Sequence, residues 1–557
     1  MGEDMKILLA ALNSQYCHSN PAVFALKNAI KDLEPQIDIT MAQWNVNRPQ
    51  RQLLREIYTG NYNIVAFSCY IWNVDYLLHL AADLKRIAPE PTIIFGGPQA
   101  TAQVDVLSCQ ESPVDGVIAG EGEIVWRCYL QAVIKGDLRP QIKGLNWKGQ
   151  SSYTKADPVD LATLDFLYDQ EDLQSLQDKI VYYESSRGCP FACTFCVSAK
   201  ERLHNRPIAL VKDDLNKLAN RGGQIKFVDR TFNAEEERAI QIIRHLLTLY
   251  RPGLSWHFEI EPDLLSESLI ELFCQAPKGY FQVEAGIQSL SQKVLAAVGR
   301  KSDWQKVKVY VSELLKKDNL HLHLDLIAGL PYEDLNSFKE AFNQVHTLYP
   351  HHLQLGFLKV LPGSLLWEQV NAGKLQNYDL RYSQNPPYQV LSTQSMSAQD
   401  LFLLEQIAQV LDQFYNPGRF RQTLYFASQI ANKDAWSFYL ALLQVRQKYP
   451  KETLALADQY NLLYQLLAKG EHAALFFDLL RLDWLSYGGG AVLPEFLRHK
   501  EDERNTFVFS HRFGFEQNGL VRVEKEVCHA FFDVQKRERR PGVSGRVLMR
   551  YIEPESQ

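Results

Sequence analysis

Three cysteines lie within eight residues near the middle of the chain, in the run Cys189-Pro-Phe-Ala-Cys193-Thr-Phe-Cys196. The apolar segment 180–183 and the turn-like Arg187-Gly188 precede this run, which is typical of a loop that follows a strand. Three thiolates on one short loop can hold three irons of a four-iron, four-sulfur cluster, because soft sulfur ligands suit iron–sulfur chemistry. The fourth iron then has no protein ligand and is open to a small molecule.

A structural zinc site is the alternative for the same three cysteines. Zinc in such sites takes four ligands, and the sequence offers no second C-x2-C pair or well-spaced histidine pair to complete the set. His204 is a stray candidate for the fourth position. The pattern therefore favours the iron–sulfur cluster over zinc.

The cysteine run resembles the signature of the radical SAM enzymes, with Phe195 at the aromatic position that often precedes the third cysteine. This resemblance implies that S-adenosylmethionine (SAM) chelates the open iron through its amino and carboxylate groups, with Phe195 beside it. It also implies that the reduced cluster passes an electron to the sulfonium and releases a 5'-deoxyadenosyl radical. We therefore expect Cys189, Cys193 and Cys196 to be both the metal ligands and the catalytic centre.

The composition is that of an ordinary globular protein. With 557 residues, 46% of them hydrophobic and 22% charged, the chain has room for three to four domains. A net charge of −6 gives no overall attraction to nucleic acid, and we interpret the basic segment 536–540 as solvated surface. The scattered remaining cysteines argue against a disulfide framework and favour a cytoplasmic location, and no apolar run is long enough to predict a membrane-spanning helix.

Short apolar runs alternate with helical stretches over residues 5–135, which predicts a parallel sheet covered by helices on both faces. The expected strands are 6–12, 38–42, 64–68, 92–96 and 116–119, and the expected helices are 21–33, 50–58, 75–87, 104–110 and 123–135. Five such units predict a flavodoxin-like, doubly wound α/β domain over residues 1–137, whose ligand binds at the carboxyl ends of the strands.

The loops that follow these strands are rich in glycine, amide and aromatic residues. Glycines let the backbone approach a bulky flat ligand, and aromatic side chains offer stacking surface. Two loops, Gly96-Gly97-Pro98 with Thr101 and Gly120-Glu121-Gly122-Glu123, resemble those of the cobalamin-binding domain that precedes the radical SAM domain in one large subfamily, although a plain turn explains either loop alone. The resemblance implies cobalamin contacts from Ser14, Tyr16, Tyr70, Trp72, Gly96, Gly97, Pro98, Thr101, Gly120, Glu121 and Gly122.

The sequence lacks the D-x-H-x-x-G pattern by which many corrinoid proteins supply a histidine to cobalt. The lower face of the cobalt therefore has no assigned ligand. His18 lies in a suitable loop, but we interpret it as a surface or loop-bonded histidine.

Residues 138–178, with polar turns and an acidic stretch, are expected to form a linker, and a second strand–helix series follows over residues 179–365. Its expected strands are 180–185, 224–229, 255–260, 280–285, 321–327 and 353–360. Six such units resemble the partial (β/α)6 barrel of radical SAM enzymes, whose chemistry takes place at the carboxyl ends of the strands. That resemblance assigns SAM contacts to Glu284 and Gln288.

Glu259 and Asp229 are weaker candidates for SAM contacts, because a helix cap or an ion pair would explain either carboxylate equally well. His321 and His323 alternate along one strand face, and no role is assigned to them.

Residues 366–557 are expected to form a mostly helical domain. Helical periodicity covers 397–415, 434–447 and 471–485, and strand-like pieces occur at 506–510 and 520–523. The region resembles the uncharacterised C-terminal extensions of some cobalamin-dependent radical SAM proteins, and we expect it to select the substrate. The aromatic residues between 415 and 426 are better explained as core than as a substrate mouth.

The cysteine run and the corrinoid-like loops together imply methylation of an unactivated carbon. One SAM would methylate reduced cobalamin, and a second would be cleaved at the cluster to make the radical that activates the substrate. The implied partners are a small-molecule or peptide substrate and an external electron donor similar to flavodoxin or ferredoxin.

Other functions fit the same layout. One alternative is a cobalamin-dependent radical enzyme that does not methylate, such as a tetrapyrrole cyclase or oxidative enzyme. Another is a corrinoid or cluster sensor without turnover. Methylthiolation of transfer RNA is disfavoured, because the segment 536–540 is the only evident basic appendage.

Overall fold

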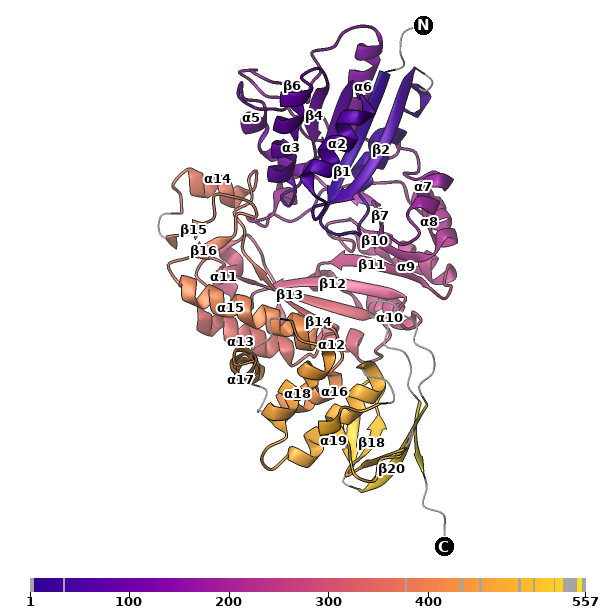
Figure 1. Ribbon diagram of the computed structural model, residues 1–557, viewed down its shortest axis with the longest axis vertical. Helices are drawn as coiled ribbons and strands as arrows, with labels where there is room; N and C mark the ends of the chain where they lie inside the picture. The colour runs from indigo at the N-terminus through magenta and orange to yellow at the C-terminus, as the bar shows by residue number, and fades with distance from the viewer. Residues whose placement is uncertain are drawn as a thin grey trace. The chain divides into compact units, whose positions relative to one another are not determined.

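In the computed structural model of the chain (Figure 1), the structure describes residues 5–33, 36–375, 378–430, 434–449, 453–488, 492–503, 506–524, 526–533 and 548–552. The basic segment 536–540 lies outside the described residues. The chain divides into two compact units. The first consists of Met1–Glu259, Lys359–Gln376 and Arg381–Val390, and the second of Ile260–Leu358, Asn377–Leu380 and Leu391–Gln557.

The first unit begins with a six-stranded sheet in the order β2-β1-β3-β4-β5-β6. Its parallel strands are β1 (Met5–Asn13), β2 (Ile37–Asn45), β3 (Ile64–Ser68), β4 (Thr92–Gly96) and β5 (Gly116–Ile118). The order of these five is the flavodoxin-like order that the sequence predicted. A sixth strand, β6 (Leu145–Trp147), pairs antiparallel with β5 and was missed, because three residues are too few to show a strand pattern.

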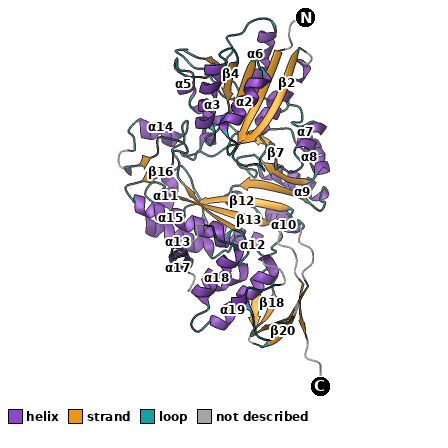
Figure 2. Ribbon diagram, in the orientation of Figure 1, coloured by secondary structure: helices purple, strands orange, loops and turns teal. Residues whose placement is uncertain are grey.

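Helices cover both faces of this sheet, as Figures 1 and 2 show. On one face α2 (Gln50–Gly60) and α3 (Val74–Ile87) pack together over a core that contains Leu8 of β1 and Phe67 of β3. Side chains alternate along a strand, so Ile7 and Leu9 point to the other face, where α1 (Pro21–Asn28) contacts β1 and α6 (Gly122–Ile134). The expected helix at 104–110 is the shorter α5 (Val104–Leu107), and an additional short helix, α4 (Pro98–Ala102), precedes it.

The region expected to be a linker is partly ordered against this first domain. It contains the short helix α7 (Gln170–Ser175), whose N-terminus is capped by the Asp169 side chain. Lys27 of α1 donates to Asp169 and to Asp172 of α7, each at 2.8 Å. Two carboxylates that hold one lysine therefore fasten α7 to α1.

The second sheet has the order β14-β13-β12-β11-β10-β7, which matches the six strands expected for a radical SAM domain. In the first unit β7 (Val181–Tyr183), β10 (Gly223–Phe227) and β11 (Leu254–Ile260) carry this sheet, and β7 and β11 each run parallel to β10. In the second unit β12 (Phe281–Gln288), β13 (His321–Ala328) and β14 (His352–Phe357) are parallel neighbours. The accompanying helices are α8 (Ile208–Arg221), α9 (Glu236–Thr248), α10 (Glu267–Gln275), α11 (Gln292–Ala297), α12 (Trp304–Leu315), α13 (Leu335–His346) and α14 (Leu365–Asn371).

Burial along β12 and β13 alternates residue by residue. Val283 and Leu322 are fully buried, whereas Glu284 and His323 on the opposite face are only half-buried. A strand with one apolar face and one polar face places its polar side chains together on one side of the sheet. The predicted SAM contact Glu284 therefore lies on the polar face of β12 and β13.

The region after residue 390 is mostly helical, as predicted. Its helices are α15 (Ala398–Val410), α16 (Arg421–Ile430), α17 (Ala435–Gln447), α18 (Leu456–Leu467) and α19 (Ala473–Asp483). Its strands are β17 (Thr506–Phe509), β18 (Arg512–Phe515), β19 (Val521–Glu524), β20 (Cys528–Asp533) and β21 (Leu548–Ile552). Two short strand pairs lie earlier in the chain: β8 (Ser186–Arg187) with β9 (His204–Asn205), and β15 (Arg381–Tyr382) with β16 (Val390–Ser392).

The aromatic residues of this region are mainly core. Tyr415 is 5% exposed and Phe420 is fully buried, and the rings of Tyr349 and Tyr425 pack edge-on to one another. This packing agrees with the interpretation of the stretch as core rather than as a substrate mouth. None of the described helices is long and apolar enough to cross a membrane.

Candidate functional site

The cluster loop, residues 188–196, carries the three cysteines between β8 and a 3-10 turn at Val197–Lys200. Cys193 is buried, and Cys189 and Cys196 are half-buried. Backbone hydrogen bonds fix the loop at both ends, because Cys189 N donates to the carbonyl of Glu201 at 3.1 Å and Cys196 N to that of Cys193 at 3.0 Å. The three thiols thus stand on one short, hydrogen-bonded loop, which is the donor set that a four-iron cluster with one open iron requires.

Glycine is required where the cluster loop begins. Gly188 has φ of +87°, and a Cβ atom there would collide with the carbonyl oxygen of Arg202. Further along the loop, Thr194 accepts a 2.7 Å hydrogen bond from the backbone N of Leu366, and Phe195 is half-buried. His204, the stray zinc candidate, bonds through Nδ1 to the carbonyl of Arg202 at 3.1 Å.

Asp229, at the end of β10, is fully buried and holds the chain just before the cluster loop. Its carboxylate accepts from Ser185 N at 2.7 Å and from Ser185 Oγ at 2.5 Å. Burial raises the pKa of Asp229 to about 6, although the hydrogen bonds from Ser185 act to lower it. Asp229 therefore has a structural partner that the sequence did not reveal, and Glu259 pairs with Lys226 at 3.1 Å.

The first group of predicted corrinoid residues lies where β1 and β3 end, which is the switch point of the flavodoxin-like order. Trp72 Nε1 and Asn73 Nδ2 both donate to the carbonyl of Leu12, at 3.1 and 3.0 Å. Tyr70 stacks on Trp72 with ring centroids 4.4 Å apart. Trp72 and Tyr16 remain 45% and 69% exposed, so this edge of the sheet presents aromatic surface to a flat ligand.

Ser14 is half-buried in the same β1 loop, but His18 is engaged elsewhere. His18 Nδ1 lies 2.6 Å from the hydroxyl of Tyr182, and burial lowers the pKa of this histidine. A second bond ties the loop to the radical SAM region, because Ser19 Oγ donates to the carbonyl of Ile180 at 2.7 Å. The structure thus agrees with the interpretation of His18 as a loop-bonded histidine.

The two glycine loops lie side by side at the ends of β4 and β5. Gly97 has φ of +102°, and a Cβ atom there would stand 2.8 Å from the carbonyl oxygen of Cys69. Gly120 N donates to Thr101 Oγ1 at 2.9 Å, so the Thr101 hydroxyl joins the two loops. Among the remaining predicted contacts, Gly96 ends β4, Pro98 begins α4 and Gly122 begins α6.

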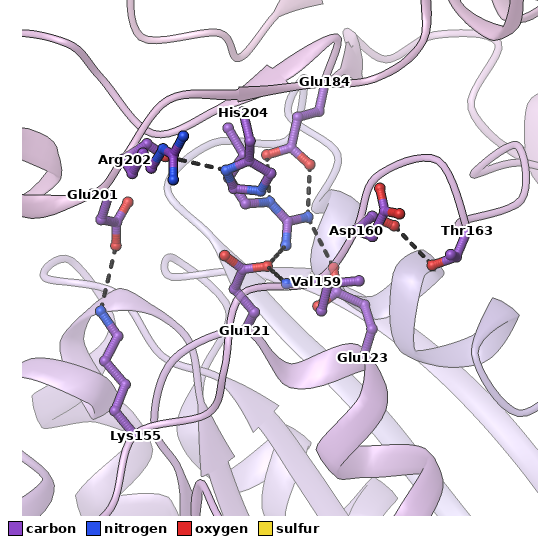
Figure 3. Close-up of polar contacts among 11 residues, drawn as sticks. Glu121, Glu123, Lys155, Val159, Asp160, Thr163, Glu184, Glu201, Arg202 and His204 are labelled. Carbon is purple, nitrogen blue, oxygen red and sulfur yellow. Dashed lines mark hydrogen bonds and ion pairs between the residues drawn. The ribbon is translucent and has the colours of Figure 1, made fainter.

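The Glu121 carboxylate, predicted to contact cobalamin, is already bonded within the protein. It accepts from Arg187 Nη1 at 2.6 Å and from Val159 N at 2.7 Å. Glu123 and Glu184 bind the same arginine, and Figure 3 shows the three carboxylates turned toward one another. The carboxylates raise the pKa of Arg187 above its ordinary value even though burial alone would lower it.

In the second unit Glu284 stands beside two residues of β13. Register places it opposite His323, and one ligand atom each from Glu284, His323 and Asp325 lie within 4.8 Å of one another. His323 Nε2 is 2.8 Å from Asp325 Oδ1. Such a set offers acceptors to an amino group, to hydroxyls or to a cation.

Gln288, the other predicted SAM contact, has an unusual backbone conformation and an amide oxygen without a hydrogen-bond partner among the described residues. Its φ of +66° is unusual outside glycine, and its side-chain amide lies so close to Gly286 that a Cβ atom there would make the amide move. The buried Gln288 Oε1 makes no hydrogen bond among the described residues. A buried amide oxygen without a partner is costly, so this atom suits a ligand that donates to it.

Two protein families match separate parts of the chain before residue 346. Residues 7–127 match the B12 binding domain, and residues 183–345 match the Radical SAM superfamily. The chain carries a B12-binding domain followed by a radical SAM domain. Residues 376–527 match a third family, described as a protein of unknown function (DUF4080). The predicted fold class is therefore confirmed, and cobalamin, a four-iron cluster and SAM are confirmed as the cofactors that these domains take.

Two relatives with methyltransferase names match part of the chain. The chain is 27% identical over 309 residues to an uncharacterized methyltransferase of Pyrococcus horikoshii, a match that covers 52% of this chain and 65% of that one. It is 23% identical over 345 residues to the cobalamin-dependent radical SAM methyltransferase TokK of Streptomyces tokunonensis, with 57% and 50% covered. The chain thus spans about half to two thirds of the length of these relatives.

A solved structure shows the same fold. The cobalamin-dependent S-adenosylmethionine radical enzyme OxsB, with aqua-cobalamin and S-adenosylmethionine bound, superimposes with a TM-score of 0.61 at 14% identity and covers 86% of this chain and 79% of its own. The likeness is one of fold, and the contact residues of this chain remain predictions.

Several residues of the site were not singled out from the sequence. Arg187 and Glu184 both precede the cluster loop, and the other partners of Arg187, Glu121 and Glu123, lie over sixty positions away in the sequence. His323 and Asp325 had a usable signal, because residues two apart on a strand share a face with each other.

Proposed function

We propose that this protein methylates an unactivated carbon, using cobalamin and a cluster-bound SAM. One observation carries the proposal: the loop of the B12-binding domain and the residue before the cluster loop are joined by hydrogen bonds of 2.6 and 2.9 Å within one compact unit. An enzyme that uses both cofactors in one reaction needs both loops held in register. The methyltransferase names of the two relatives point the same way.

The residues of the chain have separate tasks in this proposal. Cys189, Cys193 and Cys196 would hold the cluster, and Glu284 and Gln288 would bind the amino and hydroxyl groups of SAM. The loops at the ends of β1, β3, β4 and β5 would hold the corrinoid. When bound, these cofactors supply the radical and the methyl group, so the protein's own contribution is placement and the exclusion of water.

The first test is anaerobic reconstitution with iron, sulfide and hydroxocobalamin, followed by SAM and a strong reductant. We expect retained cobalamin, 5'-deoxyadenosine, and about one equivalent of S-adenosylhomocysteine per protein even without an organic substrate, because methylation of the corrinoid itself consumes SAM. Formation of 5'-deoxyadenosine without any S-adenosylhomocysteine would favour the non-methylating alternative. Protein that retains no cobalamin would overturn the proposal.

A cysteine series separates the cluster from the rest of the fold. The triple variant Cys189→Ala, Cys193→Ala and Cys196→Ala should form no 5'-deoxyadenosine and should still bind cobalamin. Cys128→Ala is the matched control, because Cys128 is exposed on α6 and should leave both cofactors unchanged. Persistent SAM cleavage in the triple variant would show that the cluster is held elsewhere.

We further propose that the region matching DUF4080 selects the substrate. It follows the radical SAM domain in the chain and matches a family separate from the two cofactor domains. Its small-molecule or peptide substrate, and an electron donor of the flavodoxin or ferredoxin type, belong to this proposal as well.

A further inference from the structure

Arg187 is the last residue of β8 and stands two positions before Cys189. Its guanidinium makes four hydrogen bonds, and every one of them ends on a carboxylate. Nε and Nη2 bind Glu184 at 3.0 and 2.7 Å, Nη1 binds Glu121 at 2.6 Å, and Nη2 also reaches Glu123 at 2.9 Å (Figure 3). The side chain is only 18% exposed, so these bonds are largely shielded from water.

The three carboxylates come from two different domains. Glu121 is the N-cap residue of α6 and Glu123 lies in the first turn of that helix, in the part of the chain that matches the B12 binding domain. Glu184 follows β7 and belongs to the radical SAM domain. One guanidinium therefore joins the predicted corrinoid loop to the strand that leads into the cluster loop.

This arrangement is not an ordinary surface ion pair. Three carboxylates surround one cation, and the side chains of Glu121 and Glu123 are 21% and 9% exposed. Like charges in such a poorly hydrated place repel one another strongly unless a cation stands between them. Arginine suits this position because its planar fork presents several donors at once, which the point charge of a lysine cannot do.

The chain next to Arg187 has little freedom to absorb a displacement. Ser185 is fixed through its N–H and hydroxyl by Asp229, and its carbonyl accepts from Arg206 N at 3.0 Å and from Arg238 Nη2 at 2.8 Å. Gly188 follows Arg187 directly, with its positive φ, and leads to Cys189. Because Ser185 is held by these bonds, we expect a shift of the corrinoid loop that moves Arg187 to displace the cluster loop through Gly188.

We propose that Arg187 is a positioning residue that couples corrinoid binding to the cluster loop, so that each cofactor strengthens the binding of the other. The proposal rests on the cofactors named under the proposed function, and it adds that their two sites are energetically linked. Binding linkage is reciprocal, so a cluster that orders the loop must tighten cobalamin by the same factor that cobalamin stabilises the cluster.

The test is the dissociation constant of hydroxocobalamin, measured anaerobically by absorbance, for the cluster-loaded full chain and for the chain stripped of iron. In the wild type we expect cobalamin to bind about tenfold more tightly when the cluster is present. In Arg187→Gln that ratio should fall to about one while both forms still bind, and Arg187→Lys should give an intermediate ratio. The reduced cluster supplies a second readout: its electron paramagnetic resonance signal should shift on adding cobalamin in the wild type and not in Arg187→Gln.

The matched control is Arg127→Gln, on the same helix as Glu123. Arg127 donates to Asp32 and to the carbonyl of Ala29, neither of which belongs to the corrinoid or cluster loops, and its loss should leave the tenfold ratio unchanged. A merely structural role for Arg187 would lower both affinities together and keep their ratio.

Each remaining outcome is informative. Equal affinity of the wild type with and without the cluster would overturn the coupling while leaving the cofactor assignment intact. Failure of every form to bind cobalamin would overturn the proposed function instead. If Arg187→Gln does not fold, the double variant Glu121→Gln and Glu123→Gln replaces it in the test, because removing these two carboxylates also removes their mutual repulsion. An unchanged ratio of cobalamin affinities with and without the cluster in that double variant would refute the proposal.

Discussion

Glu333 is a buried carboxyl group that fixes the turn after Gln288. Ser289 Oγ donates to Glu333 Oε1 at 2.5 Å, and Oε2 makes no hydrogen bond among the described residues. Burial raises the pKa of Glu333 from the ordinary 4.5 to about 8, although the Ser289 bond acts to lower it. With a pKa of about 8, Glu333 is mainly protonated at physiological pH.

The raised pKa of Glu333 predicts a pH dependence of stability. Between pH 4.5 and about 8 the folded chain keeps a proton that the unfolded chain has lost, so this stabilisation is complete at low pH and disappears as the pH rises through about 8. Glu333→Gln mimics the neutral form at every pH. From pH 5 to 8 the wild type should lose roughly 3 kcal/mol of unfolding free energy relative to this variant.

Calorimetric melting of both proteins at pH 5 and pH 8 checks this expectation. Glu340→Gln, at an exposed position of α13, is the control and should follow the wild type. A parallel pH dependence of wild type and Glu333→Gln would mean that Glu333 ionises normally.

Single residues were predictable where spacing alone defines the chemistry. The three cysteines needed no structure, because their separation already places them on one loop. The partners of Glu121 and Asp229 were not predictable, because Arg187 and Ser185 come from other strands and only the fold brings them together. Local sequence carries no signal for a bond between residues so far apart.

Asp229, which follows β10, bonds to Ser185, which follows β7, and so holds the chain just before the cluster loop. Asp229→Ala would leave the buried N–H and hydroxyl of Ser185 without an acceptor, at a cost of about 1–3 kcal/mol per group. We expect a lower melting temperature and less iron retained after reconstitution and gel filtration. Asp229→Asn keeps an acceptor oxygen and should retain most of the iron; equal loss in both variants would show that the charge, not the hydrogen bonds, is what matters.

Elements with a strong apolar pattern were predicted closely, and the others were missed. The run 64–68 and the run 92–96 agree with β3 and β4 because both are buried strands bounded by turns. Helix α16 escaped because its buried face includes Gln422 and Thr423, whose backbone N–H groups donate to Asp483. When buried helix positions hold polar residues that bond to a distant carboxylate, the helix no longer shows the apolar periodicity on which prediction depends.

At the scale of the whole molecule, the sequence suggested four consecutive regions, at 1–137, 138–178, 179–365 and 366–557, and these boundaries stay predictions. The compact units follow a different division, because the first one includes residues 359–376 and 381–390. Tyr388 accounts for part of this, since Gln99 and Gln103 donate to its hydroxyl at 3.0 and 3.1 Å. Such contacts across nearly three hundred residues are invisible to local periodicity.

Hydrogen exchange followed by mass spectrometry tests where cobalamin acts in the intact chain. A ligand that binds only the folded state lowers the population of locally open forms around its site. Adding hydroxocobalamin to cluster-loaded protein should therefore slow exchange in the loops 13–20, 69–73, 96–101 and 120–123, and, through Arg187, in the cluster loop. The helices α17 and α18, in the region that matches DUF4080, should exchange as before.

The variant Arg187→Gln sharpens this last experiment, because it should keep the protection of the corrinoid loops and lose that of the cluster loop. Arg127→Gln should show the wild-type pattern, since its partner Asp32 lies outside both loops. Protection confined to residues 398–483 would contradict all of the predicted corrinoid contacts, which lie in the N-terminal domain. Protection of the corrinoid loops alone, in wild type and Arg187→Gln alike, would retain the site and remove the coupling, since the cluster loop would then be indifferent to cobalamin.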